Sequence, residues 1–163
     1  MVSGVGANTQ LAKITLAGVP PTPGVAAEIF RVVADEGSNV DMMVQNPSGA
    51  GSTATDISLA MPRCDARRVV AGLMAARPTI GFHALHYDVG IAKLSLHGLG
   101  IRSDPLIFPR LFRALSDVGA KVDMISTSDM HIDVITPIEA LDRALSAVQF
   151  TFGLDLERER RLG

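Results

Sequence analysis

Two loops that each join an expected strand to an expected helix are the places where this sequence offers a ligand site. One contains Pro23-Gly24 and the other runs from Gly98 to Pro105. Backbone N–H groups at the start of a helix bind anions such as a carboxylate. One such loop is weak evidence, because strand-to-helix turns need Gly and Pro for their geometry. Two loops at equivalent places in the chain favour a small zwitterionic ligand.

Residue patterns typical of enzymes and metal centres are missing from the sequence. It contains no Walker phosphate loop, no Gly-x-Ser-x-Gly and no paired Cys ligands. His83 and His86 are three residues apart on an expected strand, which places them on opposite faces. Cys64 begins an expected helix without a nearby His. We therefore expect no catalytic residue, metal or cofactor. Structural roles are the simpler interpretation of the strand aspartates, although paired-carboxylate chemistry stays open for them: Asp41, Asp56, Asp123 and Asp133.

Composition excludes several functions. The 163 residues carry 15 Lys and Arg against 17 Asp and Glu, so clustered positive charge for a nucleic acid partner is not expected. Charged residues interrupt every apolar run before the roughly 20 residues that a membrane span needs. With one Cys, the fold must be held by its core, as in a reducing compartment. Since the first residues also lack a signal-peptide pattern, we expect a cytoplasmic protein.

The chain contains an internal repeat. Ala12-Lys-Ile-Thr-Leu16 returns 80 residues later as Ala92-Lys-Leu-Ser-Leu96, and Val40-Asp-Met-Met43 returns 82 residues later as Val122-Asp-Met-Ile125. Matches that keep order and residue type indicate two homologous modules.

Hydrophobic periodicity assigns the same elements to both modules. Alternating apolar residues predict strands, and apolar residues at helical spacing followed by Gly or Pro predict helices. The order is an α+β arrangement, in which an antiparallel sheet offers one apolar face to both helices. We expect strands at 11–19, 40–46, 54–61, 84–89, 92–99, 122–128 and 131–136, and helices at 25–37, 65–77, 109–118 and 138–152. The domains are then 11–90 and 91–153, the second completed by 1–10, followed by a charged tail at 154–163.

Two motifs carry a resemblance to a known family. Asn39-Val-Asp-Met-x-x-Gln45-Asn46 resembles the first ACT domain of aspartokinases, and Ile125-Ser-Thr-Ser128 resembles the second. The similarity extends from about Val2 to Gly153 and keeps the family's order. It implies two ferredoxin-like βαββαβ domains. Because no amino-kinase domain precedes them here, the chain resembles the separate regulatory (β) subunit of α2β2 aspartokinases and is not expected to phosphorylate aspartate alone.

The resemblance also implies partners and a ligand. It predicts a homodimer formed through ACT domains, a catalytic (α) subunit as partner, and feedback inhibition by threonine or lysine in aspartate-family amino-acid biosynthesis. Ligands would lie between the first ACT domain of one chain and the second of its partner. The implied threonine positions are Pro21, Gly24, Ala26, Ala27, Gln45, Gly119, Lys121 and Val122. The implied lysine positions are Asp41, Ile107, Phe108, Ser126 and Ser128.

Several of these positions depart from the family's pattern. Pro21 replaces an Asp that receives the amino group of the effector, and proline offers neither charge nor N–H. Leu106 replaces a Gly, Phe108 adds bulk, and Lys121 replaces an Asn. We therefore expect weakened or altered feedback. Two alternatives stay open, namely a free-standing ACT amino-acid sensor for another protein and a structural subunit that binds no effector.

Overall fold

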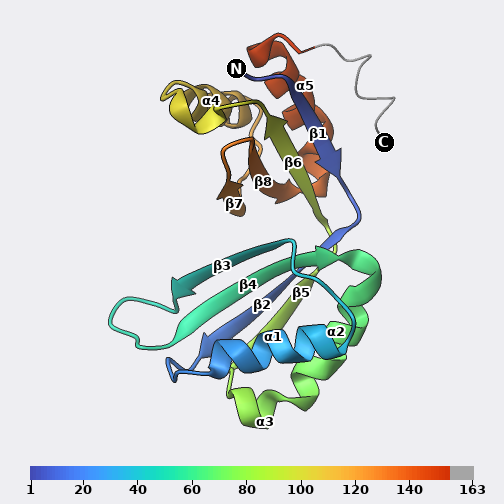
Figure 1. The fold of residues 1–163 in the computed structure, drawn as a ribbon, viewed down its shortest axis with the longest axis vertical. Coiled ribbons are helices and arrows are strands. Elements are labelled where there is room, and N and C mark those ends of the chain that lie inside the picture. Colours follow the sequence, from blue (N-terminus) through green and yellow to red (C-terminus); the bar gives the residue numbers. More distant parts are fainter. Residues whose placement is uncertain (155–163) are drawn as a thin grey trace. The chain divides into compact units, whose positions relative to one another are not determined.

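The chain forms two compact units. The computed structural model describes residues 1–154. The first unit comprises Gln10–Val89, and the second unit combines Met1–Thr9 with residues 90–154 (Figure 1). Apart from Leu154, the charged tail expected at 154–163 lies outside the described residues.

The first unit is a four-stranded antiparallel sheet with its helices on one face (Figure 1). The sheet order is β3-β4-β2-β5. The elements are β2 (Leu11–Val19), α1 (Val25–Asp35), β3 (Met42–Pro47), β4 (Thr55–Pro62), α2 (Arg63–Ala75), α3 (Arg77–Ile80) and β5 (Ala84–Asp88).

The second unit repeats this arrangement with a different connection. Its sheet order is β1-β6-β8-β7, and its first strand comes from the start of the chain, where Gly4 lies opposite His97. The elements are β1 (Gly4–Asn8), β6 (Ile91–His97), η1 (Ile101–Ser103), α4 (Ile107–Asp117), β7 (Met124–Thr127), β8 (His131–Pro137), η2 (Ile138–Ala140) and α5 (Leu141–Phe152).

These two sheets confirm the predicted fold class, α+β with two ferredoxin-like units. The boundaries of all four expected helices shift. Helix α1 ends at Asp35, two residues before the expected end, and the helix expected at 138–152 begins as η2 before α5. The helix expected at 65–77 is divided into α2 and α3, because Pro78 has no N–H and occupies the first turn of a new helix. Helix α4 begins at Ile107, two residues before the expected start.

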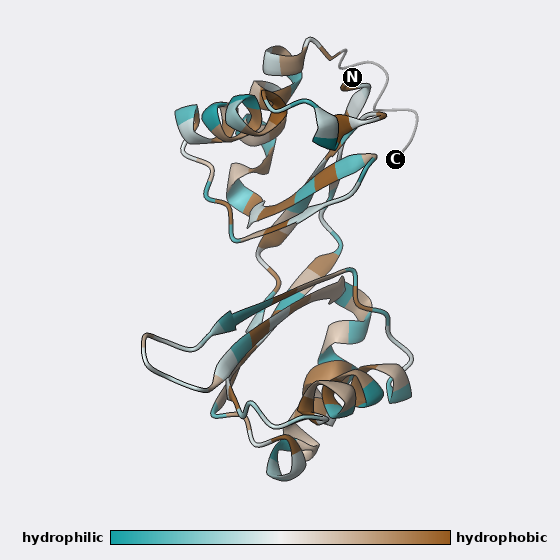
Figure 2. Ribbon diagram, turned by 60° about the vertical axis from the view of Figure 1, so that its left-hand side comes forward, coloured by the Kyte–Doolittle hydropathy of each residue, from teal (hydrophilic) through white to brown (hydrophobic). Residues whose placement is uncertain are grey.

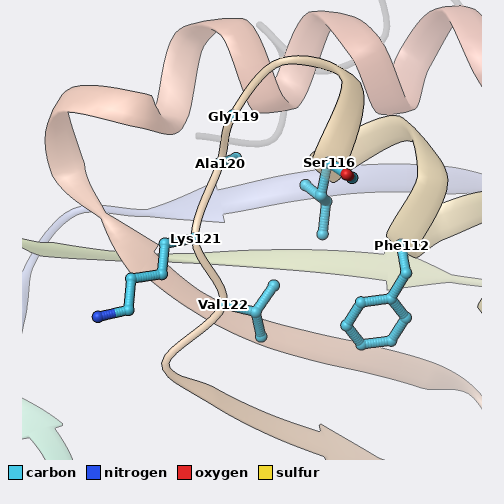
Figure 3. Close-up of a pocket in the computed structure, with 7 residues that line it drawn as sticks. Phe112, Ser116, Gly119, Ala120, Lys121 and Val122 are labelled. Carbon is cyan, nitrogen blue, oxygen red and sulfur yellow. The ribbon is translucent and has the colours of Figure 1, made fainter.

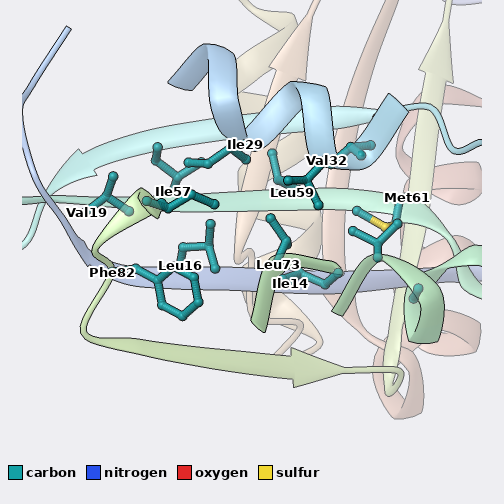
Figure 4. Close-up of a cluster of buried hydrophobic side chains, with 14 of the residues drawn as sticks. Ile14, Leu16, Val19, Ile29, Val32, Ile57, Leu59, Met61, Leu73 and Phe82 are labelled. Atoms are coloured by element: carbon teal, nitrogen blue, oxygen red, sulfur yellow. The ribbon is translucent and has the colours of Figure 1, made fainter. Parts of the chain in front are cut away.

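Alternation along β2 explains the core of the first unit. Ile14 and Leu16 are fully buried, whereas Lys13 and Thr15, which alternate with them, are only half-buried on the opposite face. The buried side chains pack against the apolar stripes of α1 and α2 (Figure 4). These stripes consist of Ile29, Val32 and Val33 on α1 and Ala66, Val69 and Leu73 on α2.

The second unit has a core of its own, built in the same way. Leu94 and Leu96 of β6 and Val134 of β8 are fully buried. They belong to one cluster with Leu111 of α4 and Val148 of α5. Figure 2 shows apolar residues along the strands of both sheets. Each unit therefore buries one face of its sheet under its own helices.

A bulge near the end of β2 holds a carboxylate. The register between β2 and β4 shifts between Leu16 and Val19. Gly18, at φ +67°, donates its backbone N–H to Oδ1 of Asp56 at 2.9 Å, and the Ser48 hydroxyl donates to the same oxygen at 2.7 Å. The Ser48 hydrogen bond and then the Gly18 N–H lower the pKa of Asp56 below its ordinary value.

We predict that Ser48→Ala raises the pKa of Asp56 and lowers the free energy of unfolding by about 1 kcal/mol at neutral pH. Because the pKa of Asp56 is lower in the folded than in the unfolded protein, ionised Asp56 stabilises the fold at any pH above its unfolded pKa. This stabilisation is lost as the pH falls through the pKa of Asp56 in the folded protein. The free energies of unfolding of the unchanged protein and of Ser48→Ala should therefore become equal in acid. Urea unfolding across pH and carboxyl NMR titration measure both effects. Thr53→Ala, an exposed change in the same hairpin loop, is the matched control. A stability difference that persists in acid would contradict the prediction.

Candidate functional site

A small hollow in the first unit gathers three of the predicted positions. Pro21, Ala26 and Gln45 line a cavity of about 100 Å³ between the β2–α1 loop and strands β3 and β4. Its other walls come mainly from apolar side chains, and Thr22 and Thr55 add hydroxyl groups. Among the described residues, no Asp, Glu, Lys or Arg lines this cavity. The hollow therefore suits a small uncharged group and lacks a carboxylate for an ammonium.

The start of α1 lies beside this hollow. Gly24 is the N-cap residue at φ +92°, and no side chain caps the helix. The N–H of Val25 donates to the carbonyl of Thr22 at 3.3 Å. Unfilled N–H groups in the first turn of a helix attract a carboxylate. Gly24 and Ala27 are exposed but do not line the hollow.

A larger hollow in the second unit gathers three further predicted positions. Gly119, Lys121 and Val122 line a cavity of about 370 Å³ with Phe112 and Leu115 of α4 (Figure 3). In Figure 3, Val122 and Phe112 extend to one side of the segment and Lys121 to the other. The Lys121 ammonium lies 3.7 Å from the Asp123 carboxylate, which is the charge it pairs with. The hollow itself presents a mainly apolar surface.

Hydrogen bonds from α5 stabilise the turn at Val118 and Gly119 that shapes this hollow. Gly119, at φ +66°, donates its N–H to the carbonyl of Ser116 at 3.0 Å. Arg143 of α5 donates its Nε–H to the carbonyl of Val118 at 2.8 Å and pairs with Glu139. Sequence reasoning missed Arg143, because nothing in the local pattern indicates a contact 25 residues away.

The remaining predicted positions lie elsewhere. Ile107 is in the core of the second unit and 2% exposed, and Phe108 is half-buried with its ring stacked on Phe112 at 6.4 Å. Ser126 is exposed on β7, and Ser128 lines a separate hollow of about 530 Å³ at the end of the sheet. Asp41 is exposed in the first unit, just before β3. Four of the five lysine positions thus lie in the second unit, and Asp41 lies in the first.

The loop before α4 differs from the loop before α1. Oδ1 of Asp104 accepts the N–H of Leu106 at 2.9 Å, so this loop satisfies one of its donors with its own carboxylate. Pro109, in the first turn of α4, lacks an N–H altogether. The two loops are related by the repeat, but the second has fewer free donors for a ligand. An Asp two residues before the N-cap of a helix is a sequence signal that predicts this contact.

Neither a metal centre nor a membrane helix is found in the described part of the chain. Among residues 1–154, no three His, Cys, Asp or Glu side chains are grouped to hold a metal ion. Within the same residues, no helix has the length and apolar character to cross a membrane.

We predict that Gly119→Ala lowers the free energy of unfolding by about 1–2 kcal/mol, because an alanine is strained at this positive φ. A Cβ there has no atom within 4 Å, so crowding adds nothing. Urea unfolding measures the effect. Gly49→Ala, which is equally open and has no positive φ, is the matched control. Equal stability of the two variants would contradict the prediction.

Comparisons with known proteins agree with this architecture. A family model described as ACT domain matches residues 14–76 and 94–152. The aspartokinase of Mycolicibacterium smegmatis is 40% identical over 154 residues, covering 94% of this chain and 37% of that protein. The aspartokinase of Mycobacterium tuberculosis is 39% identical over 159 residues, covering 98% of this chain and 38% of that protein. The chain thus spans less than two fifths of these relatives.

Solved structures cover the chain more completely. The ligand-free regulatory subunit of aspartate kinase from Thermus thermophilus is 34% identical with a TM-score of 0.86, and the match covers 93% of this chain and 99% of that one. A chain in a structure of aspartokinase alpha and beta subunits is 33% identical with a TM-score of 0.87, and the match covers 94% of this chain and 100% of that one.

Proposed function

Because the chain belongs to the ACT domain family, as an aspartokinase-related regulatory protein, we propose that it binds a small amino-acid effector and controls aspartate phosphorylation by a catalytic aspartokinase chain. The observation that carries the proposal is the match to a solved regulatory subunit over nearly the whole of both chains. The two hollows support it, because each gathers three of the residues that the family resemblance assigns to an effector.

The proposed assembly is a homodimer together with a catalytic subunit. In this arrangement the hollow of the first unit in one chain faces the hollow of the second unit in its partner, and the effector binds between them. An effector shifts such an assembly by its difference in affinity for the two arrangements of the subunits. The chain then controls the kinase without contributing a catalytic residue.

The effector site of this chain is proposed to be weak for threonine and lysine. Pro21 supplies neither charge nor N–H to the small hollow, and no carboxylate in the described part of the chain lines that hollow. A lost charge-assisted hydrogen bond costs about 1.5–3 kcal/mol, or roughly ten- to hundredfold in affinity. In the second unit, the Phe108 ring stacked on Phe112 leaves less room for a second ligand, and the Asp104 carboxylate, which already accepts the Leu106 N–H, leaves fewer donors.

Kinase assays with a catalytic aspartokinase chain test the proposal. We expect the isolated chain to be inactive and to co-elute with the catalytic chain when the two are mixed. Adding threonine and lysine together should change the kinase rate of this mixture by less than twofold. Strong inhibition would overturn the weakened site while supporting the regulatory role. Failure to co-elute would overturn the regulatory subunit and favour a sensor for another protein.

Restoring a carboxylate at the small hollow tests the reason for weak binding. We predict that Pro21→Asp raises the affinity for threonine ten- to hundredfold, because an ammonium gains a charge-assisted partner. Thermal shift measurements report this directly, since a ligand at a hundred times its Kd adds about 2.7 kcal/mol. Pro23→Asp is the matched control, because Pro23 is exposed in the same loop but does not line the hollow. Equal gains from both variants would contradict the role of Pro21.

A further inference from the structure

The turn that joins β7 to β8 is built on the hydroxyl group of Ser128. Its Oγ accepts the N–H of Met130 at 3.2 Å and the N–H of His131 at 3.1 Å. The backbone N–H of Ser128 closes the turn by donating to the carbonyl of His131 at 2.8 Å. A serine oxygen has two lone pairs and one proton. Two incoming N–H groups use both lone pairs, so the hydroxyl is left as a donor.

The proton of this hydroxyl has an imidazole nitrogen as its partner. Nδ1 of His131 lies 2.9 Å from Ser128 Oγ, whereas the carbonyl oxygen of His131 lies 3.4 Å away and already accepts a bond. Because Oγ is the donor in this pair, Nδ1 must be unprotonated. The neutral His131 ring then carries its proton on Nε2.

A largely enclosed carboxylate lies next to the same nitrogen. Oδ2 of Asp133, two residues along β8 on the same face, is 3.8 Å from Nδ1 of His131. The Asp133 side chain is 12% exposed, and its other oxygen accepts the Ser95 hydroxyl. Oδ2 is thus the oxygen that faces the ring. A protonated imidazole is the natural partner for such a carboxylate.

Other charged or titratable groups of the second unit lie around His131. From β6, His97 lies directly opposite, with its ring 6.2 Å away and nearly perpendicular. Lys93 lies further along β6, opposite Ile135. Beside the turn, Asp129 pairs with Arg102 at 3.6 Å. Strand β7 presents Ser126 and Thr127 beside β8, and neither titrates.

We propose that protonation of His131 exchanges its hydrogen bond with Ser128 for an ion pair with Asp133, so that the β7–β8 turn has two states set by pH. A proton on Nδ1 turns that atom into a donor, but the Ser128 oxygen already accepts two bonds. The Asp133 carboxylate is the acceptor within reach.

The exchange changes what the turn presents to solvent. Ser128, His97 and His131 line the 530 Å³ hollow at this end of the sheet. In the neutral form the Ser128 proton is donated to the ring. In the acid form the ring leaves and the hydroxyl proton is free for the His131 carbonyl or a bound molecule. This inference needs only the second unit and does not depend on the proposed function.

NMR spectroscopy of the full chain tests the exchange between pH 8 and pH 5. Long-range proton–nitrogen spectra should show the Nε2–H form of His131 at pH 8. On acidification, cross-relaxation between the ring and the Ser128 methylene should fall at least twofold. The amide signals of Met130 and His131 should move with the midpoint of the ring. An Nδ1–H form at pH 8, or amide signals that stay fixed while the ring titrates, would overturn the proposal.

Two variants separate the exchange from ordinary titration. Asp133→Asn keeps an acceptor for Ser95 but removes the charge, and should reduce the pH-dependent movement of the two amide signals at least twofold. Ser128→Ala removes the donor, and should allow the Nδ1–H form at pH 8. His83→Gln, in the first unit, is the matched control and should leave both readouts unchanged. Unchanged amide movement in Asp133→Asn would show that the carboxylate is not the new partner and would overturn the proposal.

Discussion

Burial on a single face of each sheet is the constraint that orders the rest of this molecule. The two long helices of each unit need to bury an apolar stripe, and both pack on the same side of four strands. Polar groups are therefore placed on the opposite face, at strand edges and in loops. The cross-strand pair Thr15–Ser58 and its counterpart Ser95–Asp133 occupy that opposite face in the two units. The candidate ligand sites lie at helix ends for the same reason.

The two units have kept the same framework while their loops have diverged. Before α1, Gly24 leaves the helix start uncapped beside a hollow whose described lining residues are all uncharged. Before α4, the Asp104 carboxylate and Pro109 reduce the free donors of the corresponding helix. A duplicated fold thus offers two settings with different chemistry. In the second unit, Ser128, His131 and Asp133 interact beside the β7–β8 turn. In the longer β3–β4 hairpin of the first unit, Ser48 instead donates a hydrogen bond to Asp56.

The sequence predicted most of the strands and the fold class, because alternation and the repeat are local signals. Strand β2 was predicted with its observed bounds, and the fold class is confirmed. Contacts between distant residues were not predictable in this way. Two hydrogen bonds depend on how the elements pack. One joins Arg143 to the Val118 carbonyl, and the other joins the Gly18 N–H in the β2 bulge to Asp56. For the site, residue types indicated the loops, but the gathering of Pro21, Ala26 and Gln45 at one hollow required the fold.

The position of β1 makes the second unit a circular permutant of the first. In the first unit the strand that follows the second long helix, β5, returns to pair with β2. In the second unit the same edge beside β6 is taken by β1, which precedes the whole first unit in the chain. The first unit is therefore an insertion between two neighbouring strands of the second. Strand β1 pairs with β6 across about 80 intervening residues. The loss of chain entropy therefore opposes formation of the second sheet more than formation of the first. In kinetic terms, the contiguous unit is the one that can form early, and the permuted unit is complete only when β1 has paired with β6 across the intervening first unit.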